Sequence, residues 1–154
     1  MFKKTLLVIL LFLTTGCGYE PIHSKKKMLD TNFSINKIDL IGDREINIKI
    51  KQKLNNYILN KKTKNYYLKV NSESTKTTVA KNTKGDPTVF NLDVKILVLV
   101  TTKDNSIMQM RFVEKFKYNN KKDKFEIKRY EKEIKINLTE AIMNDLIIRL
   151  SSSK

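Results

Sequence analysis

The only cysteine of the chain, Cys17, stands at the end of a segment that is typical of exported precursors. Lys3 and Lys4 give a positive start, residues 5–13 form an unbroken apolar run, and small residues 14–16 precede the cysteine. The run is too short for a membrane-spanning helix, which needs about 20 residues. Cleavage before Cys17 would free its sulfur and its new amino group for acylation, and several acyl chains hold a protein stably on a membrane. Cys17 is therefore the predicted lipidation site, and its covalent lipid is the only cofactor that we expect.

One position departs from the usual lipoprotein pattern. Thr14 stands three residues before the cysteine, where leucine is typical, and Leu13 lies one residue further back. An uncleaved anchor helix, or ordinary secretion with an unmodified cysteine, therefore stay open as alternatives. We predict that residues 1–16 are a lipoprotein signal peptide that is removed, and that residues 17–34 are a lipidated N-terminus and tether.

Few side chains of this sequence could carry out catalysis. His23 is the only histidine and lies in the predicted tether, so the folded part cannot hold a Ser-His-Asp arrangement. A structural zinc site would need several Cys or His ligands. Carboxylate pairs that could perform acid–base chemistry are Glu131 with Glu133 and Asp86 with Asp93, but carboxylates on lysine-rich surfaces usually form solvated ion pairs. We expect neither an enzyme nor a metal site.

The charge of the chain is strongly positive. Lys and Arg number 31 against 16 Asp and Glu, which gives +15, and removal of Lys3 and Lys4 with the signal peptide lowers this to +13. In an exported protein this charge does not indicate nucleic acid, because the anionic surfaces outside the cytoplasm are lipid phosphates and lipopolysaccharide. A lysine-rich composition with a merely solvated surface explains the same charge, and both explanations stay open.

Several lysines cluster in or beside predicted turns. Their ammonium groups are point charges suited to phosphate, although each lysine by itself could be solvated surface. In an antiparallel sheet, the loops 81–87 and 119–124 should lie at the same end and the loop 103–106 at the opposite end. The candidate residues for binding lipopolysaccharide or another anion are Lys81, Lys84, Lys103, Lys117, Lys121 and Lys122.

The first elements of the folded part are a strand over residues 35–41 and a helix over residues 44–60. Gly42 ends the strand, and Asp43 is a suitable N-cap for the helix. Apolar residues four positions apart predict one buried stripe on this helix. The stripe consists of Ile46, Ile50, Leu54 and Ile58.

Three β segments follow. Alternation begins at residues 66–70 and continues to about residue 80 past a bulge near 79–80, and turn residues fill 81–87. Residues 88–102 form the longest segment; its second half, with Leu97 and Leu99 on the other face, is expected to be covered on both sides. After a turn at 103–106, residues 107–118 return with one apolar register, namely Met108, Met110, Phe112, Phe116 and Tyr118.

A long helix is expected over residues 125–150, or alternatively a shorter one that begins after a break at Asn137, and residues 151–154 are expected to fray. Its apolar face comprises Ile127, Tyr130, Ile134, Leu138, Ala141, Ile142, Leu146 and Leu150. The order is β-α-β-β-β-α. This predicts one α+β domain over residues 35–150, in which two helices pack on one face of a four-stranded, mostly antiparallel sheet.

The residues after the predicted cleavage point resemble a known family. Cys17-Gly18-Tyr19-Glu20-Pro21-Ile22 is similar to the Cys-Gly-aromatic-x-Pro-Leu start of LPS-assembly lipoproteins (LptE) of the alphaproteobacterial type. The likeness continues with a long strand opening at residues 67–70, a link at residues 80–91, a hairpin ending at Tyr118-Asn119 and a closing helix ending at residues 148–150.

The resemblance implies a location and a partner. Members of this family sit on the periplasmic face of the outer membrane, plug the β-barrel of the LPS-assembly protein LptD, assist its assembly and help lipopolysaccharide reach the cell surface. The phosphates of lipid A would be the anionic ligand. Gly18 agrees with outer-membrane sorting, because an aspartate there would have suggested inner-membrane retention. A binding subunit or pilotin of another cell-envelope complex is the alternative.

Overall fold

The structure is a computed structural model that describes residues 32–58, 62 and 64–152. Cys17, the predicted signal peptide and residues 17–31 of the predicted tether lie outside the described residues. Four strands form one sheet in the order β1-β2-β3-β4, and two helices complete the fold. The elements are β1 (Phe33–Gly42), α2 (Arg44–Ile58), β2 (Lys64–Lys81), β3 (Pro87–Thr101), β4 (Ile107–Asn119) and α3 (Lys124–Ser152).

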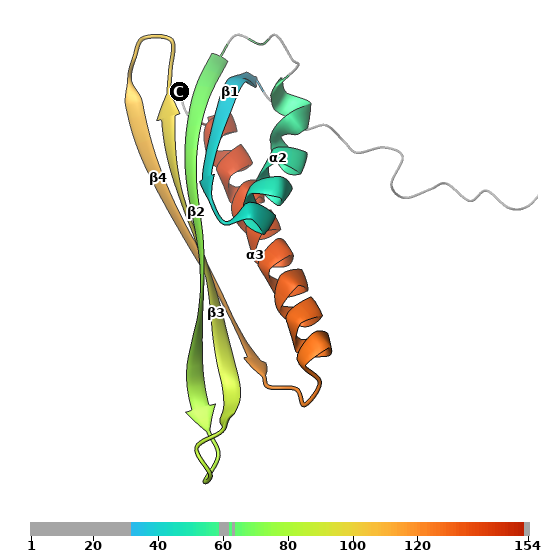
Figure 1. Cartoon of the computed structure of the whole chain (residues 1–154). Helices are drawn as coiled ribbons and strands as arrows, with labels where there is room; N and C mark the ends of the chain where they lie inside the picture. Colours follow the sequence, from blue (N-terminus) through green and yellow to red (C-terminus); the bar gives the residue numbers. More distant parts are fainter. Residues whose placement is uncertain (1–31, 59–61, 63, 153–154) are drawn as a thin grey trace, which may run out of the picture. The chain divides into compact units, whose positions relative to one another are not determined.

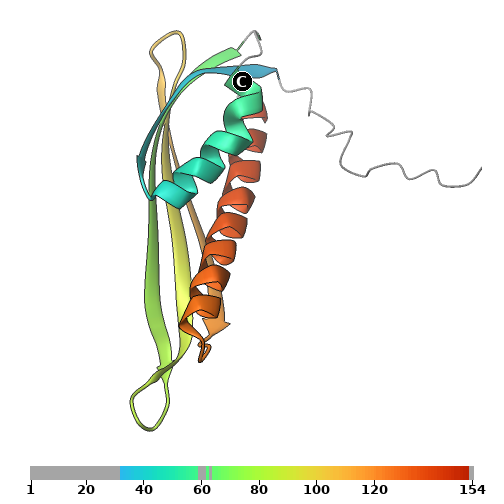
Figure 2. The same cartoon turned by 45° about the vertical axis from the view of Figure 1, so that its right-hand side comes forward.

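The element order β-α-β-β-β-α and the α+β class confirm the prediction from sequence. β1 pairs with β2 in parallel through the crossover helix α2, and the two remaining strand pairs are antiparallel. Figures 1 and 2 show α2 and α3 side by side on the same face of the sheet. The loop between β2 and β3 lies at the same end as the connection from β4 to α3, and the β3–β4 turn lies at the opposite end, as expected.

β1 begins two residues earlier than predicted, at Phe33, which the sequence pattern assigns to the tether. Its ring is 1% exposed and stacks on Tyr57 of α2 at 5.1 Å between ring centroids. The strand signal is weak there because polar residues follow, and the tertiary contact with α2 decides the start. α2 is described to Ile58, so its predicted end at residue 60 falls outside the described residues.

Gly42 and Asp43 make the connection from β1 to α2. Gly42 has a φ of 104°, a conformation that side chains with a Cβ rarely adopt. The Asp43 N–H donates to the Ser72 carbonyl oxygen at 3.0 Å. The Asp43 carboxylate then accepts from the backbone N–H groups of Glu45 and Ile46, so it caps α2 as predicted.

The sheet has a proximal and a distal region, which differ in the helices that pack on them. The proximal region, residues 33–58, 64–72, 94–113 and 139–152, includes β1 and both helices, and it holds the larger apolar core. The distal region, residues 73–93 and 114–138, is covered by the first half of α3 alone. Its smaller cluster of buried residues is Phe90, Leu92, Tyr118, Ile127 and Ile134.

The face of the sheet that lies away from the helices is open. Two expectations for the strands are therefore wrong. Leu97 and Leu99 are half-buried rather than covered on both sides, because no described element packs over them. Met108 and Phe116 belong to the predicted buried register of β4 but are 42% and 41% exposed, because β4 is an edge strand that α3 covers only in part.

α3 runs without interruption through Asn137, so the single long helix is confirmed and the break is not. It continues to Ser152, which places two residues of the predicted frayed tail inside the helix; residues 153–154 lie outside the described residues. Ala141 is exposed instead of buried, whereas Met143 and Ile147 are buried. The buried stripe shifts along the helix because the apolar side chains of its second half join the core that α2 also covers.

Candidate functional site

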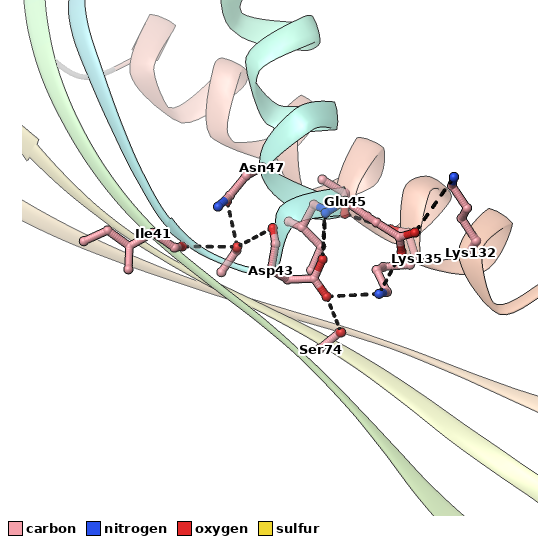
Figure 3. Close-up of polar contacts among 10 residues, drawn as sticks. Ile41, Asp43, Glu45, Asn47, Ser74, Lys132 and Lys135 are labelled. Carbon is pink, nitrogen blue, oxygen red and sulfur yellow. Dashed lines mark hydrogen bonds and ion pairs between the residues drawn. The ribbon is translucent and has the colours of Figure 1, made fainter. Parts of the chain in front are cut away.

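The first candidate is a polar cluster where α2, β2 and α3 meet, shown in Figure 3. The Lys135 ammonium of α3 donates to Asp43 Oδ2 and to Glu45 Oε2, both at 3.0 Å. The Ser74 hydroxyl of β2 also donates to Asp43 Oδ2, at 2.7 Å. Nearby, the Ser72 hydroxyl lies 2.8 Å from Asn47 Oδ1. The cluster therefore links three elements that are distant in sequence.

The ionisable groups of this cluster stabilise each other's charged forms. Burial opposes ionisation of Asp43, but hydrogen bonds from Ser74, Lys135 and the Ile46 N–H outweigh it, so the pKa of Asp43 is lowered. Burial likewise opposes the charge of Lys135, yet its bonds to Glu45 and Asp43 raise the pKa. Neither hollow described below is lined by a residue of this cluster. Its ion pairs and hydrogen bonds hold α2, β2 and α3 together, and we call this cluster the structural clamp.

A second ionic contact joins the two helices. The ammonium groups of Lys53 and Lys49 lie 2.8 and 2.9 Å from the carboxylate oxygens of Glu140. Their hydrogen bonds, that of Lys53 first, lower the pKa of Glu140 to about 2. These lysine charges of α2 are thus neutralised by a carboxylate of α3.

The second candidate is the distal end of the domain. Lys81 ends β2, Lys84 lies in the β2–β3 turn, and Lys117 lies near the end of β4. Lys121 and Lys122 belong to the connection between β4 and α3. Five of the six lysines proposed from sequence thus share one end of the sheet, while Lys103 lies at the other end, in the β3–β4 turn.

Two asparagines hold the distal loops in place. Asn82 Oδ1 accepts from the N–H groups of Lys84 and Asp86, and its carbonyl oxygen accepts from the Gly85 N–H. Asn120 donates from its side chain to the Pro87 carbonyl oxygen and from its backbone to Thr88, both at 2.8 Å. The β2–β3 turn and the connection to α3 are thereby fixed next to each other.

A hollow of about 480 Å³ opens between the end of β4 and the start of α3. Aromatic rings and two ammonium-bearing side chains share its wall. This combination can receive a molecule that is partly apolar and carries a negative charge. The lining residues are Val89, Phe116, Lys117, Tyr118, Asn119, Lys121 and Tyr130.

The inner wall of the hollow is held by Glu131 of α3. Its carboxylate accepts from the Tyr118 hydroxyl at 2.8 Å and from the Lys76 ammonium, which lies 3.8 Å from the centroid of the Phe90 ring. Burial, then the hydrogen bond to Glu131 and the negative charge of that carboxylate, raise the pKa of the Tyr118 hydroxyl. Tyr118 therefore stays neutral at physiological pH and acts as a hydrogen-bonding aromatic wall.

The lysines of the distal end differ from those of the clamp in their partners. Lys121 pairs with Glu126 at 2.6 Å and lies 4.8 Å from the centroid of the Tyr130 ring. No carboxylate among the residues that the structure describes lies within ion-pair distance of the other four. These four residues with free positive charge are Lys81, Lys84, Lys117 and Lys122.

Sequence reasoning missed the aromatic portion of this site. Phe116 and Tyr130 are assigned by their spacing to the buried faces of β4 and α3, but the first is exposed and the second only half-buried. A usable signal is present: aromatic residues at positions 116 and 118 directly precede the lysine-rich break at 119–124. Only the approach of α3 to the edge strand turns them into a wall.

Three of the four carboxylates considered for catalysis contact other side chains. Glu131 is engaged as described, Asp93 contacts Asn91 and Lys115, and Asp86 contacts Asn82. Among the described residues, no group of three His, Cys, Asp or Glu side chains is placed to hold a metal ion. Neither described helix has the length and apolarity needed to cross a bilayer.

No protein-family model matches this sequence, and no curated protein matches it either. Solved structures do share the fold. Rare lipoprotein B from Shewanella oneidensis superimposes with a TM-score of 0.54 at 12% identity, over 71% of this chain and 92% of that one. A minor lipoprotein from Acinetobacter baumannii gives 0.52 at 14% identity, over 76% and 91%. Lipoprotein B from Nitrosomonas europaea gives 0.51 at 10% identity, over 79% and 86%. At these identities the likeness shows a shared fold.

Proposed function

We propose that this chain is a lipoprotein anchored through Cys17 on the periplasmic face of the outer membrane. In this proposal it is a non-enzymatic subunit of lipopolysaccharide transport that plugs and supports the assembly of the β-barrel LptD. The observation that carries the proposal is the distal end of the sheet. An aromatic hollow lined by Lys117 and Lys121 lies there, and Lys81, Lys84 and Lys122 at the same end have no acidic partner among the described residues.

The chemistry of that end suits lipid A. The phosphates of lipid A require cations that are not already neutralised by neighbouring carboxylates, and Lys81, Lys84 and Lys122 meet this condition within the described residues. The aromatic wall at Phe116 and Tyr130 offers apolar contact beside the charge. A simple inorganic anion would bind the lysine ammonium groups but would make no apolar contact with the aromatic rings.

Two further findings support the proposal. The fold is shared with three solved structures that are described as lipoproteins. The sequence itself places Cys17 after a short apolar leader, where acylation would occur. Mass spectrometry of the mature N-terminus tests the anchor: we expect residues 1–16 to be absent and the mass of Cys17 to include its acyl groups. An intact leader, or an unmodified Cys17, would contradict it.

Lipopolysaccharide binding can be tested with charge-neutral variants. Replacing four distal lysines by glutamine should raise the Kd for purified lipopolysaccharide by at least about tenfold, which corresponds to roughly 1.4 kcal/mol. The matched control removes the same charge from exposed lysines elsewhere and should change the Kd by no more than about twofold. The test set is Lys81, Lys84, Lys121 and Lys122, and the control set is Lys51, Lys69, Lys95 and Lys103. An equal loss of affinity in both sets would show that net charge alone is responsible for lipopolysaccharide binding.

The partner can be tested by crosslinking in intact cells followed by purification of the lipidated chain. We expect recovery of LptD. Recovery of a secretin or an inner-membrane complex instead would favour the alternative function as a pilotin or another envelope subunit. Purification as a lone monomer without any crosslinked barrel would contradict the proposal.

A further inference from the structure

Among the described strands, β4 lies at an edge of the sheet and pairs with β3 alone. It pairs with β3 over 13 residues without any register shift. The Thr102 N–H donates to the Ser106 carbonyl and the Asn120 N–H donates to the Thr88 carbonyl, so hydrogen-bonded pairs of these two strands fall on even residue numbers. The odd residues of β4 therefore direct their N–H and C=O groups away from β3. Between Met108 and Tyr118 the outward-directed residues are Gln109, Arg111, Val113, Lys115 and Lys117.

A second free edge offers a contrast. β1 pairs with β2 only as far as Ser72, which leaves residues 73–81 without a neighbour on that side. This edge is rich in Ser, Thr and Lys and carries register shifts on both sides of Ala80, which are the usual means of preventing strand pairing. β4 carries charged side chains but no register shift, and Ile107, Met108, Val113 and Phe116 are exposed large apolar side chains along it.

The open face beside β4 is hollowed. A depression of about 370 Å³ lies between β2, β3 and the edge strand, and Leu97, Arg111 and Val113 contribute to its wall. A strand added next to β4 would direct every second side chain toward this face. The depression can hold one such side chain.

We propose that the β4 edge binds an extended segment of a partner protein as an antiparallel fifth strand, with acidic side chains on the open face and apolar side chains on the helix side. Charge decides the chemistry of the segment. On the open face β4 presents Arg111, Lys115 and Lys117. Among the described residues only Lys115 has a carboxylate within ion-pair distance, Asp93 at 3.6 Å, and Glu73 lines the same depression as Arg111. On the helix side it presents the apolar Met108 and Phe116. β-Strand addition uses main-chain hydrogen bonds for affinity and alternate side chains for specificity.

Two of the registers in which a second copy of the same chain could pair with this edge set like charges opposite each other. Antiparallel pairing of two copies about Val113 would set Arg111 opposite Lys115. Pairing about Glu114 would set the two glutamates opposite each other and Arg111 opposite Lys117. Like charges placed directly opposite each other destabilise a strand pair.

The test uses the full mature chain and a capped synthetic peptide of about nine residues that alternates glutamate and valine. On binding, the amides of Gln109, Arg111, Val113 and Lys115 should exchange hydrogen at least about tenfold more slowly, as seen by NMR. The same peptide N-methylated at each glutamate keeps its side chains but loses the donors that face β4, so it should bind at least about tenfold more weakly. Equal binding of both peptides would overturn strand addition.

Protein variants complete the test. Val113→Pro removes one outward N–H while leaving the β3–β4 bonds intact, and should weaken peptide binding. Its matched control is Thr78→Pro on the protected edge. The Ser72 carbonyl accepts from the Asp43 N–H, so the even residues of β2 direct their backbone groups away from β3. Thr78→Pro therefore also removes an outward N–H, but it should have no effect on peptide binding. Should Val113→Pro fail to fold, the double variant Arg111→Glu and Lys115→Glu provides the test instead. It should no longer bind the glutamate peptide and should bind the corresponding lysine peptide. Unchanged preference would contradict the proposed charge pattern.

Two other results would overturn the assignment of the occupant. Protection of the same β4 amides that rises with protein concentration, without peptide, would show that a second copy binds there. Protection of residues 74–78 instead of β4 would place the site on the other edge. The distal lysine variants described above leave β4's middle unchanged, so loss of lipopolysaccharide binding and loss of peptide binding are separable results.

Discussion

The proximal and distal regions of the domain are built from the same strands but use their charged and apolar residues differently. Two helices bury a large apolar core in the proximal region, and Lys49 and Lys53 of α2 are paired there with Glu140 of α3. A single helix covers a cluster of five buried residues in the distal region, and several lysines there have no described acidic partner. The proximal region is thus organised for stability, and the distal region leaves charge and aromatic surface available for a ligand.

The largest expected effect comes from the two glycines with positive φ. In Gly42→Ala the new Cβ would lie 1.9 Å from the Ser72 carbonyl oxygen, at a φ of 104°, so we expect a loss of at least about 3 kcal/mol in the free energy of unfolding. Gly85→Ala in the distal turn meets no atom within 4 Å, and only the unfavourable φ of 88° should cost about 1 kcal/mol. Urea denaturation measures both. Equal losses would show that the distal turn is as constrained as the proximal junction.

The next largest effect on stability comes from shortening apolar side chains in the two regions. Leu54→Ala empties a fully buried position between α2 and the sheet and should cost about 3 kcal/mol. Phe116→Ala removes a larger side chain that is 41% exposed, and it should cost less than about 1 kcal/mol while weakening ligand binding at the hollow. Thermal unfolding combined with a lipopolysaccharide titration checks the pair. A greater stability loss for Phe116→Ala would mean that the distal aromatic wall belongs to the core.

The smallest effect comes from the two helix caps and depends on pH. The pKa of Asp43 is lowered from 3.8, so the stability due to its charge is present above pH 3.8 and is lost as the pH falls through the lowered value. Asp43→Asn keeps a capping oxygen but loses the charge opposite Lys135, and should cost about 1 to 2 kcal/mol at pH 7. Urea denaturation at several pH values measures this cost, and the difference from the wild type should shrink below pH 3.8.

Asp123 is the distal counterpart of this cap. It accepts from the N–H groups of Phe125 and Glu126 at the start of α3, and these bonds lower its pKa, but the carboxylate is solvent-exposed. Asp123→Asn should therefore shift the midpoint of urea denaturation much less than Asp43→Asn. A pH-dependent loss as large as that of Asp43→Asn would contradict the structural role assigned to the clamp.

Much of the fold could be predicted from local patterns. The four-residue spacing of Ile46, Ile50 and Leu54 defined the buried face of α2, and Gly42 with Asp43 marked its start. The same patterns failed at the edge strand, because alternation in β4 predicts which side chains share a face but not whether another element covers that face. Phe116 and Met108 are exposed for this reason.

The sequence by itself determined the order of elements, their amphipathic faces and the end of the sheet at which the lysine-bearing loops meet. These follow from chain periodicity and from the geometry of antiparallel strands. Only the tertiary structure decided which lysines are neutralised, which aromatic residues line a hollow, and that one long edge remains free. Those features depend on the distance between side chains of different elements, such as Lys135 and Asp43 or Tyr118 and Glu131, and no local pattern encodes that distance.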